Sequence, residues 1–301
     1  MFTVGVDAKQ WGGRAWNEDF NGVATDTMFN DKKVTELAGY AVVQQTLFDK
    51  LTLNAGIRLE NNDGYGNEWA PQGGIAYQIN NQTTVKASVS KGFRSPNIND
   101  LFNPYNGAAN PDLKPEEMTN FDVSCLQSLW NHKLQVELTA FYAKGKNRIL
   151  APTSWGELNS NSGKFTNKGI DFAVTYQALP TLKLSGNYSY LHSDIKIPAA
   201  PKHKAFVSAN WAIDKCTISP SVQYINDLYL AEYNDRGIPA EAIIPESYEN
   251  YALLNCKVTY QATPWINLFV NGENLTNTSY QMYNGYQMPG VVVLGGFDVK
   301  F

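Results

Sequence analysis

The chain has 301 residues, of which 17% are charged and 13% are aromatic, and its formal net charge is −4. A soluble globular chain has roughly a quarter of its residues charged, so this composition is poor in charge. The small negative charge disfavours nucleic-acid binding, which needs a basic face. Three cysteines are too few for a disulfide framework. No apolar run approaches the roughly 18 residues of a membrane-spanning helix.

Along the chain, apolar and polar residues alternate with a period of two. In the segment from Leu51 to Glu60, the odd positions are apolar and the even positions are polar or glycine. This alternation is typical of a half-buried strand rather than a helix. The pattern predicts about fourteen strands, at residues 2–11, 34–48, 51–61, 68–80, 83–92, 117–129, 132–145, 164–178, 181–192, 202–213, 216–228, 249–261, 265–274 and 292–301.

The connections between these strands alternate between short and long. The short ones are tight turns at residues 48–50, 80–82, 130–132, 179–181, 214–215 and 262–264. The long ones are polar segments at residues 12–33, 93–116, 146–163, 229–248 and 275–291. Short turns at one end and long loops at the other are typical of a transmembrane β-barrel.

The strand lengths agree with this fold class, because a strand that crosses a bilayer needs roughly 9 to 11 residues. Lipid offers no hydrogen-bond partners, so only helices and closed sheets can span it. We therefore expect an all-β, transmembrane antiparallel barrel with its apolar face toward lipid. Its charged face, with Arg58, Glu60 and Lys133 among others, would line a wet lumen. One short helical turn is expected at Ser95 to Phe102, with Ser95 as its cap.

Four segments resemble the TonB-dependent outer-membrane receptor family. The first, Tyr40 to Asp63, contains the Gly-x-Arg-x-Glu pattern Gly56, Arg58 and Glu60. Val89 to Phe102 contains a Gly-Phe-Arg-x-Pro loop, and Asn110 to Val123 contains an Asn-Pro-x-Leu-Lys-Pro-Glu box. The fourth segment, NLFVNGENLTNTSY followed by GGFDVKF, is similar to the closing hairpin of the family with its terminal aromatic residue.

The resemblance implies a barrel of 22 strands that is closed by an N-terminal plug domain. This chain would supply about fourteen of those strands, as a single C-terminal region at residues 1–301 with no plug domain. It implies a place in the bacterial outer membrane and TonB-energised uptake of a scarce nutrient, with a ferric siderophore or a cobalamin-like molecule as first choice. The expected partners are outer-membrane lipid, the small-molecule ligand and, through a plug domain not present in this chain, the TonB complex. No enzymatic activity, cofactor, metal site or nucleic-acid partner is expected.

The candidate ligand-binding residues lie in the long loops. Arg94 carries a planar cation that suits carboxylate, phosphate or catecholate oxygens, although it and the Asn-Pro box also suit a purely structural role in the loop. Aromatic and amide side chains at the mouth of a barrel suit large, flat ligands. The full candidate set is Arg94, Asn97, Tyr105, Trp155, Tyr229 and Tyr283.

Three alternatives remain open from the sequence, and the last of them is a structural or adhesin barrel. The first is a passive pore, which would be a closed barrel made of these strands alone. The second is an outer-membrane barrel enzyme, for which His192 and His203 are the candidate pair because they flank a short loop and would lie across from each other in a hairpin.

Overall fold

The computed structural model describes residues 1–19, 21–102, 109–150, 157–230 and 247–300. The described part is almost entirely β-structure with one short helix. The elements are β1 (Phe2–Glu18), β2 (Ala24–Leu47), β3 (Leu51–Asn62), β4 (Gly66–Asn80), β5 (Thr83–Arg94), α1 (Ile98–Phe102), β6 (Glu116–Leu129), β7 (Leu134–Leu150), β8 (Ser160–Leu179), β9 (Leu182–Ser193), β10 (His203–Ile213), β11 (Cys216–Leu230), β12 (Ser247–Thr263), β13 (Ile266–Glu273), β14 (Gln281–Tyr283), β15 (Tyr286–Gln287) and β16 (Val292–Val299). Within the described residues, no helix is both long and apolar enough to cross a membrane.

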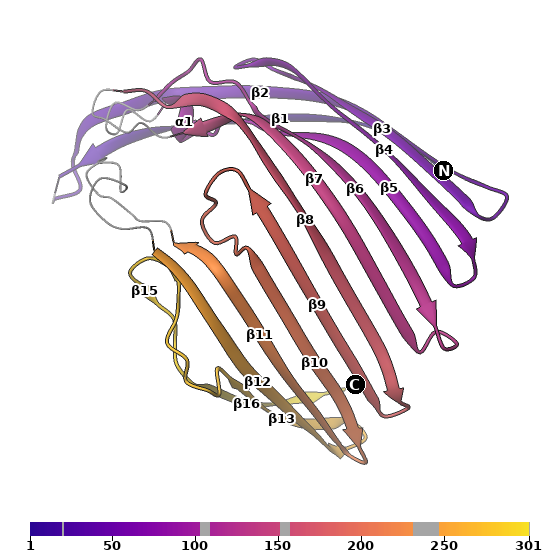
Figure 1. Cartoon of the computed structure of the whole chain (residues 1–301). Helices are drawn as coiled ribbons and strands as arrows, with labels where there is room; N and C mark the ends of the chain where they lie inside the picture. Colours follow the sequence, from indigo (N-terminus) through magenta and orange to yellow (C-terminus); the bar gives the residue numbers. More distant parts are fainter. Residues whose placement is uncertain (20, 103–108, 151–156, 231–246, 301) are drawn as a thin grey trace.

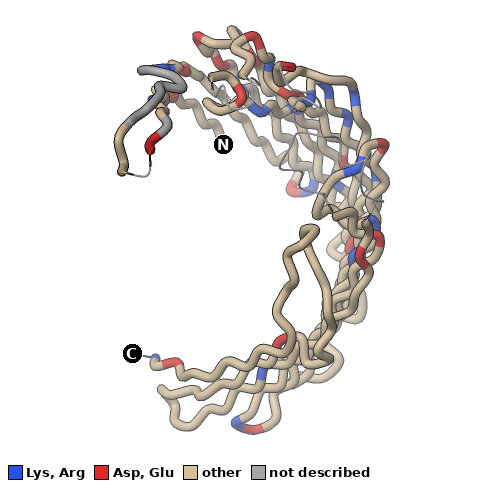
Figure 2. The backbone as a smooth tube through the Cα atoms, turned by 90° about the vertical axis from the view of Figure 1, so that its left-hand side faces the viewer, with Lys and Arg blue, Asp and Glu red and all other residues tan. Residues whose placement is uncertain are grey.

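Fourteen strands form one antiparallel sheet in which every strand pairs with its neighbour in sequence, from β1 to β13 and then β16. The short strands β14 and β15 form a separate hairpin. The sheet curves into a wall with a C-shaped cross-section, and β1 and β16 lie at its two open edges (Figure 2). The prediction of about fourteen antiparallel strands is confirmed. The passive-pore alternative requires these strands to close into a cylinder by themselves. The described residues form an open wall instead.

The two ends of the wall differ as the sequence predicted. The short turns lie together at one end, and α1 lies at the other end (Figure 1). Positive backbone φ angles occur in several of the short turns, at Phe48 and Asp49 and again at Trp130, Asn131 and His132. Such angles let a two- or three-residue connection match the twist of the flanking strands.

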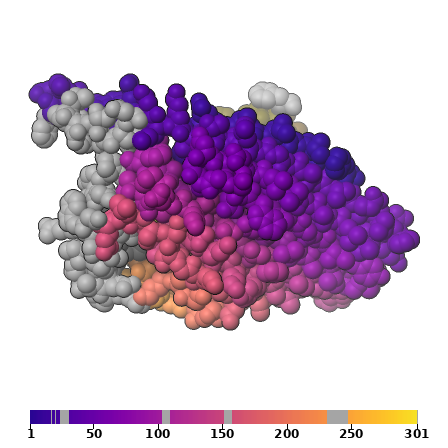
Figure 3. Space-filling view, turned by 90° about the horizontal axis from the view of Figure 1, so that it is seen from above, coloured from indigo at the N-terminus to yellow at the C-terminus, as the bar shows by residue number. Residues whose placement is uncertain are grey.

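The cross-strand register sorts the side chains onto two faces. Leu59 pairs with Trp69, and Val123 pairs with Ala140, so residues of one parity in each strand share a face. On the convex side these residues are apolar and exposed. The exposed fraction is 55% for Leu59, 56% for Val123 and 50% for Leu138. Figure 3 shows this outer side as an unbroken surface in which the strands follow one another in sequence order. A broad exposed apolar surface of this kind is suited to lipid rather than to water.

The hairpin of β1 and β2 is longer than the sequence predicted. Residues 12–33 were expected to be a loop, but the strands continue to Glu18 and resume at Ala24, with Trp16 paired to Thr27. In the same way β7 runs to Leu150 and β8 begins at Ser160. A strand of 24 residues such as β2 is more than twice the length that a bilayer requires. The hairpins therefore project beyond the membrane on the long-loop side.

An apolar cluster covers the concave side of β11 and β12. It consists of Ile225, Leu228, Leu230, Tyr251 and Leu253, each at most 8% exposed. The segment that carries β14 and β15 folds over this cluster, and the rings of Tyr251 and Tyr280 lie 4.4 Å apart. The hairpin thus packs onto the inside of the wall (Figure 2).

Candidate functional site

Arg94 joins four elements at the long-loop end of the wall. Its Nε donates a 2.7 Å hydrogen bond to Oε2 of Glu116, and its Nη1 lies 3.6 Å from Oδ2 of Asp100 in α1. The other carboxylate oxygen of Glu116 accepts a 2.7 Å hydrogen bond from the backbone N–H of Ile149 in β7. One cation and its two acids therefore hold together the end of β5, the helix α1, the start of β6 and the end of β7.

Asn97 caps α1. Its Oδ1 accepts hydrogen bonds from the backbone N–H groups of Asn99 (2.9 Å) and Asp100 (3.0 Å), and Oδ2 of Asp100 accepts one from the backbone of Asn97 (3.0 Å). This reciprocal arrangement satisfies the free donors of the first helical turn. The expectation that Ser95 caps the helix was wrong, because α1 begins at Ile98 and the Ser95 hydroxyl shares a 2.6 Å hydrogen bond with Tyr65.

The Asn-Pro-x-Leu-Lys-Pro-Glu box also has a structural role. The side chain of Asn110 donates to the backbone oxygen of Asn159, Leu113 is 2% exposed, and the backbone of Lys114 donates to Oδ1 of Asn161. These contacts attach the box to the chain around the start of β8. The sequence left open a purely structural role for Arg94 and the box. The contacts described here are of that kind.

A cavity of about 720 Å³ lies on the concave face beside α1. Its lining comes from β1 to β5 and from residues 95–98, and includes Lys9, Trp11, Glu36, Arg58 and Glu60. Arg58 bridges Asp7 and Glu60, and the indole N–H of Trp11 donates a 2.7 Å hydrogen bond to Glu36. The cavity thus contains charged side chains that ion pairs and a hydrogen bond hold in fixed positions.

Tyr65 connects this cavity to the loop that carries α1. Its hydroxyl donates a 2.8 Å hydrogen bond to Glu60, which is 8% exposed, and also contacts Ser95. Burial raises the pKa of the Tyr65 phenol, so it remains a neutral donor. Our candidate set did not include this network. The pattern of Gly56, Arg58 and Glu60 was the available signal, since it placed an acid and a base on the lumen side.

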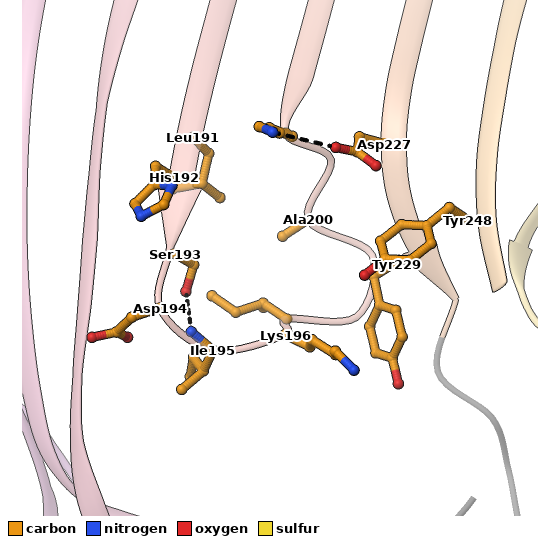
Figure 4. Close-up of a pocket in the computed structure, with 12 residues that line it drawn as sticks. Leu191, His192, Ser193, Asp194, Ile195, Lys196, Ala200, Asp227, Tyr229 and Tyr248 are labelled. Atoms are coloured by element: carbon orange, nitrogen blue, oxygen red, sulfur yellow. Dashed lines mark hydrogen bonds and ion pairs between the residues drawn. The ribbon is translucent and has the colours of Figure 1, made fainter. Parts of the chain in front are cut away.

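A second cavity, which we call the rim pocket, lies between the β9–β10 loop and the ends of β11 and β12 (Figure 4). Its volume is about 320 Å³. Tyr229 and Tyr248 lie with their ring centres 5.6 Å apart, and the ammonium group of Lys196 lies 5.8 Å from the ring of Tyr229. Lys202 and Asp227 form an ion pair of 3.6 Å at its edge. A cation beside paired aromatic rings can hold a flat anionic group.

The remaining candidates do not join these two cavities into one site. Tyr283 is 51% exposed on the β14–β15 hairpin, where it pairs with Tyr286. No contact between described residues connects Tyr283 or Tyr229 to Arg94. Tyr105 and Trp155 lie outside the described residues.

The two histidines of the enzyme alternative are not paired across the hairpin. His203 lies opposite Tyr190, and its Nδ1 shares a 2.7 Å hydrogen bond with the hydroxyl of Tyr188, whereas His192 lines the rim pocket. His203 was expected to lie opposite His192, but its partner Tyr190 is two residues earlier in β9. Among the described residues, no group of three or more His, Cys, Asp or Glu side chains could hold a metal ion.

Comparison with known families agrees with the architecture. Residues 2–275 match the family model described as "TonB dependent receptor-like, beta-barrel". The chain belongs to the TonB-dependent receptor family. It is therefore the barrel part of a bacterial outer-membrane receptor, and its family consists of transport receptors rather than enzymes.

Two curated relatives differ in how much of this chain they match. The chain is 28% identical over 304 residues to the iron-regulated outer membrane virulence protein of Vibrio cholerae, a match that covers 89% of this chain and 45% of that protein. It is 41% identical over 68 residues to the vitamin B12 transporter BtuB of Photobacterium profundum, which covers 23% of this chain and 11% of that protein. The chain thus spans less than half the length of the relatives it matches.

Two solved structures have the same fold. The siderophore receptor PirA of Acinetobacter baumannii superposes with a TM-score of 0.81 at 16% identity, over 100% of this chain and 52% of that one. The ferric enterobactin receptor PfeA of Pseudomonas aeruginosa gives a TM-score of 0.81 at 18% identity, over 100% of this chain and 51% of that one. At these identities the likeness establishes the fold.

Proposed function

We propose that this chain forms part of the wall of a receptor that takes up a scarce nutrient, with a ferric siderophore as first choice and a cobalamin-like molecule as second. The observation that carries the proposal is the fold: the whole wall superposes on siderophore receptors. Sequence relatives that are iron-regulated or that transport vitamin B12 support the two ligand classes. Energy would come from the TonB complex acting on a plug domain, which is not part of the described chain.

The long-loop end supplies the groups that a bulky ligand needs. In the rim pocket, which lies at the long-loop ends of β11 and β12 on the side opposite the apolar cluster, Lys196 and the rings of Tyr229 and Tyr248 suit a first contact with a ligand that carries negatively charged, aromatic oxygens. We assign direct ligand contact to Tyr229, Tyr283, Tyr105 and Trp155. Arg94 and Asn97 act differently in this proposal: they hold the loop that carries α1, because their polar groups are already used by Glu116, Asp100 and the helix start.

The test is uptake of radiolabelled ligand by iron-starved cells that produce the receptor as their sole TonB-dependent importer. We expect accumulation of a ferric catecholate, or of cyanocobalamin, that stops when TonB is inactivated. Tyr229→Ala and Lys196→Ala should each weaken binding several-fold. Lys215→Ala, an exposed lysine in a short turn at the opposite end, serves as the matched control.

Two results would contradict the proposal. Accumulation that continues without TonB would indicate a passive pore. Equal uptake by Tyr229→Ala, Lys196→Ala and Lys215→Ala would remove the rim pocket from the binding site.

A further inference from the structure

The ladder between β4 and β5 ends well before the two strands do. Its outermost pair is Gln72 with Ser90. Among the described residues, residues 66–71 of β4 and 91–94 of β5 form no ladder pair with each other, although all of them are in strands. On their far sides both strands stay paired to their outer ends, β4 with β3 and β5 with β6. We call this split in the wall the seam.

Pro71 explains where the ladder ends. The backbone N–H of Gln78 donates to the carbonyl of Lys50 on the β3 side, so the odd-numbered residues of β4 direct their backbone groups toward β5. Pro71 is the next odd-numbered residue beyond the last pair, and the register, continued by one residue, places it opposite Lys91. Because proline has no backbone N–H, it cannot complete this pair.

A proline alone does not keep two strands of this wall apart. Pro220 lies in the middle of β11, where the ladder between β10 and β11 skips residues 219 and 220. That ladder continues on both sides of the gap, whereas the β4–β5 ladder does not resume beyond Pro71. Side chains must therefore occupy the space between β4 and β5 above the proline.

Lys91 forms a side-chain bridge across the seam. Its ammonium group lies 3.4 Å from Glu68 of β4, 2.7 Å from Glu117 of β6 and 5.1 Å from the centre of the Trp69 ring. The side chains of Lys91 and of both acids are at most 15% exposed. By the register, Glu68 belongs to the concave face and Glu117 to the convex face. A cation that reaches both acids lies within the thickness of the wall, where two hydrogen-bonded strands ~4.8 Å apart would leave it no room.

The seam borders the cavity of about 720 Å³ beside α1. The lining of this cavity includes Ala70 on one side of the seam and Gly92 and Phe93 on the other. A second bridge crosses here, because the hydroxyl of Tyr65 shares a 2.6 Å hydrogen bond with the hydroxyl of Ser95. Backbone without ladder partners is tolerated at membrane depth where it lines a cavity that water can enter. The cavity therefore makes an interrupted ladder possible at this place.

The seam begins inside the apolar band and continues above it. From Gln78, beside a short turn, to Pro71 the strand advances by about seven residues, which at ~3.4 Å each and a tilt of ~40° gives ~18 Å. The apolar band of a bacterial barrel is ~25 Å tall. Below the seam, backbone pairs join β4 to β5, so a separation of the two strands is confined to their outer ends.

We propose that the seam is a gate in the side of the wall and that Lys91 is its latch. In the closed state, the contact between Lys91 and Glu68 holds the outer ends of β4 and β5 together. When this contact breaks, the two ends separate by about one strand spacing, ~5 Å, and the cavity beside α1 widens. The outer parts of β1–β4 move as one body and those of β5–β8 as another, because each group keeps its own ladders.

Spin labels on the two sides of the seam measure this separation. The receptor is purified as the bacterium produces it, in a mild detergent, with its three cysteines replaced by serine. Asn61→Cys and Lys144→Cys carry the outer pair of labels, on β3 and β7, and pulsed electron paramagnetic resonance gives the distance between them. Leu53→Cys and Leu138→Cys carry the lower pair, on the same two strands below the seam.

Breaking the latch should lengthen the distance between the outer labels. Lys91→Gln removes the cation and Glu68→Gln removes its partner, and each should add about one strand spacing, ~5 Å. Lys86→Gln is the matched control, because it removes a lysine of the same strand that pairs with Glu137 below the seam, and it should leave this distance unchanged. The lower labels should keep one distance in every variant.

Restoring the missing N–H should close the seam. Pro71→Ala lets the ladder continue to Trp69 opposite Phe93, so the amides of these two residues should exchange with deuterium roughly tenfold more slowly than in the wild type. In the Pro71→Ala background, Lys91→Gln should no longer lengthen the outer distance. Pro220→Ala, which changes another proline within a strand, should alter neither measurement.

An outer distance that is equal in the wild type, Lys91→Gln and Glu68→Gln would overturn the proposal. An equal change at the lower labels would also overturn it, because it would show general loosening of the wall. Unslowed exchange in Pro71→Ala would show that the proline does not end the ladder. Heat-dependent gel mobility checks the folding of each variant. No nutrient is present in these measurements, so their outcome is independent of the proposed function.

Discussion

Arg94, the last residue of β5, donates a 2.7 Å hydrogen bond from Nε to Oε2 of Glu116, the first residue of β6. Between these two residues the chain makes the long excursion that contains α1 and the Asn-Pro box. The pair therefore closes the base of this loop, and Asp100 brings α1 to the same cation.

Replacing Arg94 by Ala should loosen this loop more than it destabilises the barrel. The guanidinium is 51% exposed, so the expected loss of stability is at most about 1 kcal/mol. Limited proteolysis should cut the segment from residue 95 to residue 115 several-fold faster than in the wild type. Lys86→Ala, which breaks the lumen pair with Glu137, is the control and should leave this rate unchanged. Unaltered cleavage in the Arg94 variant would show that other contacts hold the loop.

Substitution of Asn97 tests the position of the helix cap. Asn97→Ala should cost about 1 kcal/mol of local stability and speed hydrogen exchange at the amides of Asn99 and Asp100, because both lose their acceptor. Asn97→Asp keeps an acceptor and should retain protection. Ser95→Ala should not expose these two amides, and the opposite pattern would restore Ser95 as the cap.

The buried cluster under the β14–β15 segment should be sensitive to truncation. Leu228 is 3% exposed, and Leu228→Ala should cost about 2 to 5 kcal/mol, as for other buried leucines. Leu294, which is 52% exposed, provides a matched Leu→Ala control with a much smaller expected cost. Urea titration of the purified receptor measures both. A similar loss of stability in the two variants would contradict the packing of this segment on the wall.

Two strand glycines should respond very differently to alanine. A Cβ at Gly169 would overlap the backbone oxygen of Tyr190 and the ring of Phe141, whereas a Cβ at Gly92 would meet nothing within 4 Å. Gly169→Ala should therefore destabilise the barrel by about 1 to 3 kcal/mol, as overpacking does, and Gly92→Ala should be nearly neutral. The temperature at which the folded gel band disappears reports this difference. Equal temperatures for the two variants would show that β8 and β9 can separate at no cost.

Removing the hydroxyl of Tyr65 tests the polar network beside α1. Tyr65→Phe deletes the 2.8 Å hydrogen bond to the buried Glu60 and the contact with Ser95, and should cost about 1 to 3 kcal/mol. Tyr77→Phe, on the lipid side and 46% exposed, is the control. Thermal unfolding of both variants measures the cost. A null result for Tyr65→Phe would mean that Arg58 alone suffices to hold Glu60.

The strands could be predicted because the bilayer imposes a different solvent on each face. Leu53, Ile57 and Leu59 alternate with polar residues for that reason, and each lies on the convex face. Above the membrane both faces meet water, so this alternation disappears. Residues 12–33 consequently look like a loop in the sequence, although most of them pair in the β1–β2 hairpin.

The candidate site was less predictable because its contacts join residues far apart in sequence. The acids that hold Arg94 follow it at 6 and 22 positions, and no local pattern marks them as partners. A bulge between Ile225 and Leu228 places both of these residues in the buried cluster, so Tyr229 lies on the opposite side of β11. A simple period of two cannot show such a shift.

The free edges of β1 and β16 constrain how this wall can enter a membrane. Each edge presents a row of backbone N–H and C=O groups, and hydrocarbon cannot satisfy them. Every unpaired group in lipid costs several kcal/mol, so the penalty for a half-open intermediate grows with each residue that enters. Entry into the bilayer and the pairing of these edges must then proceed together, as one concerted event rather than two successive steps.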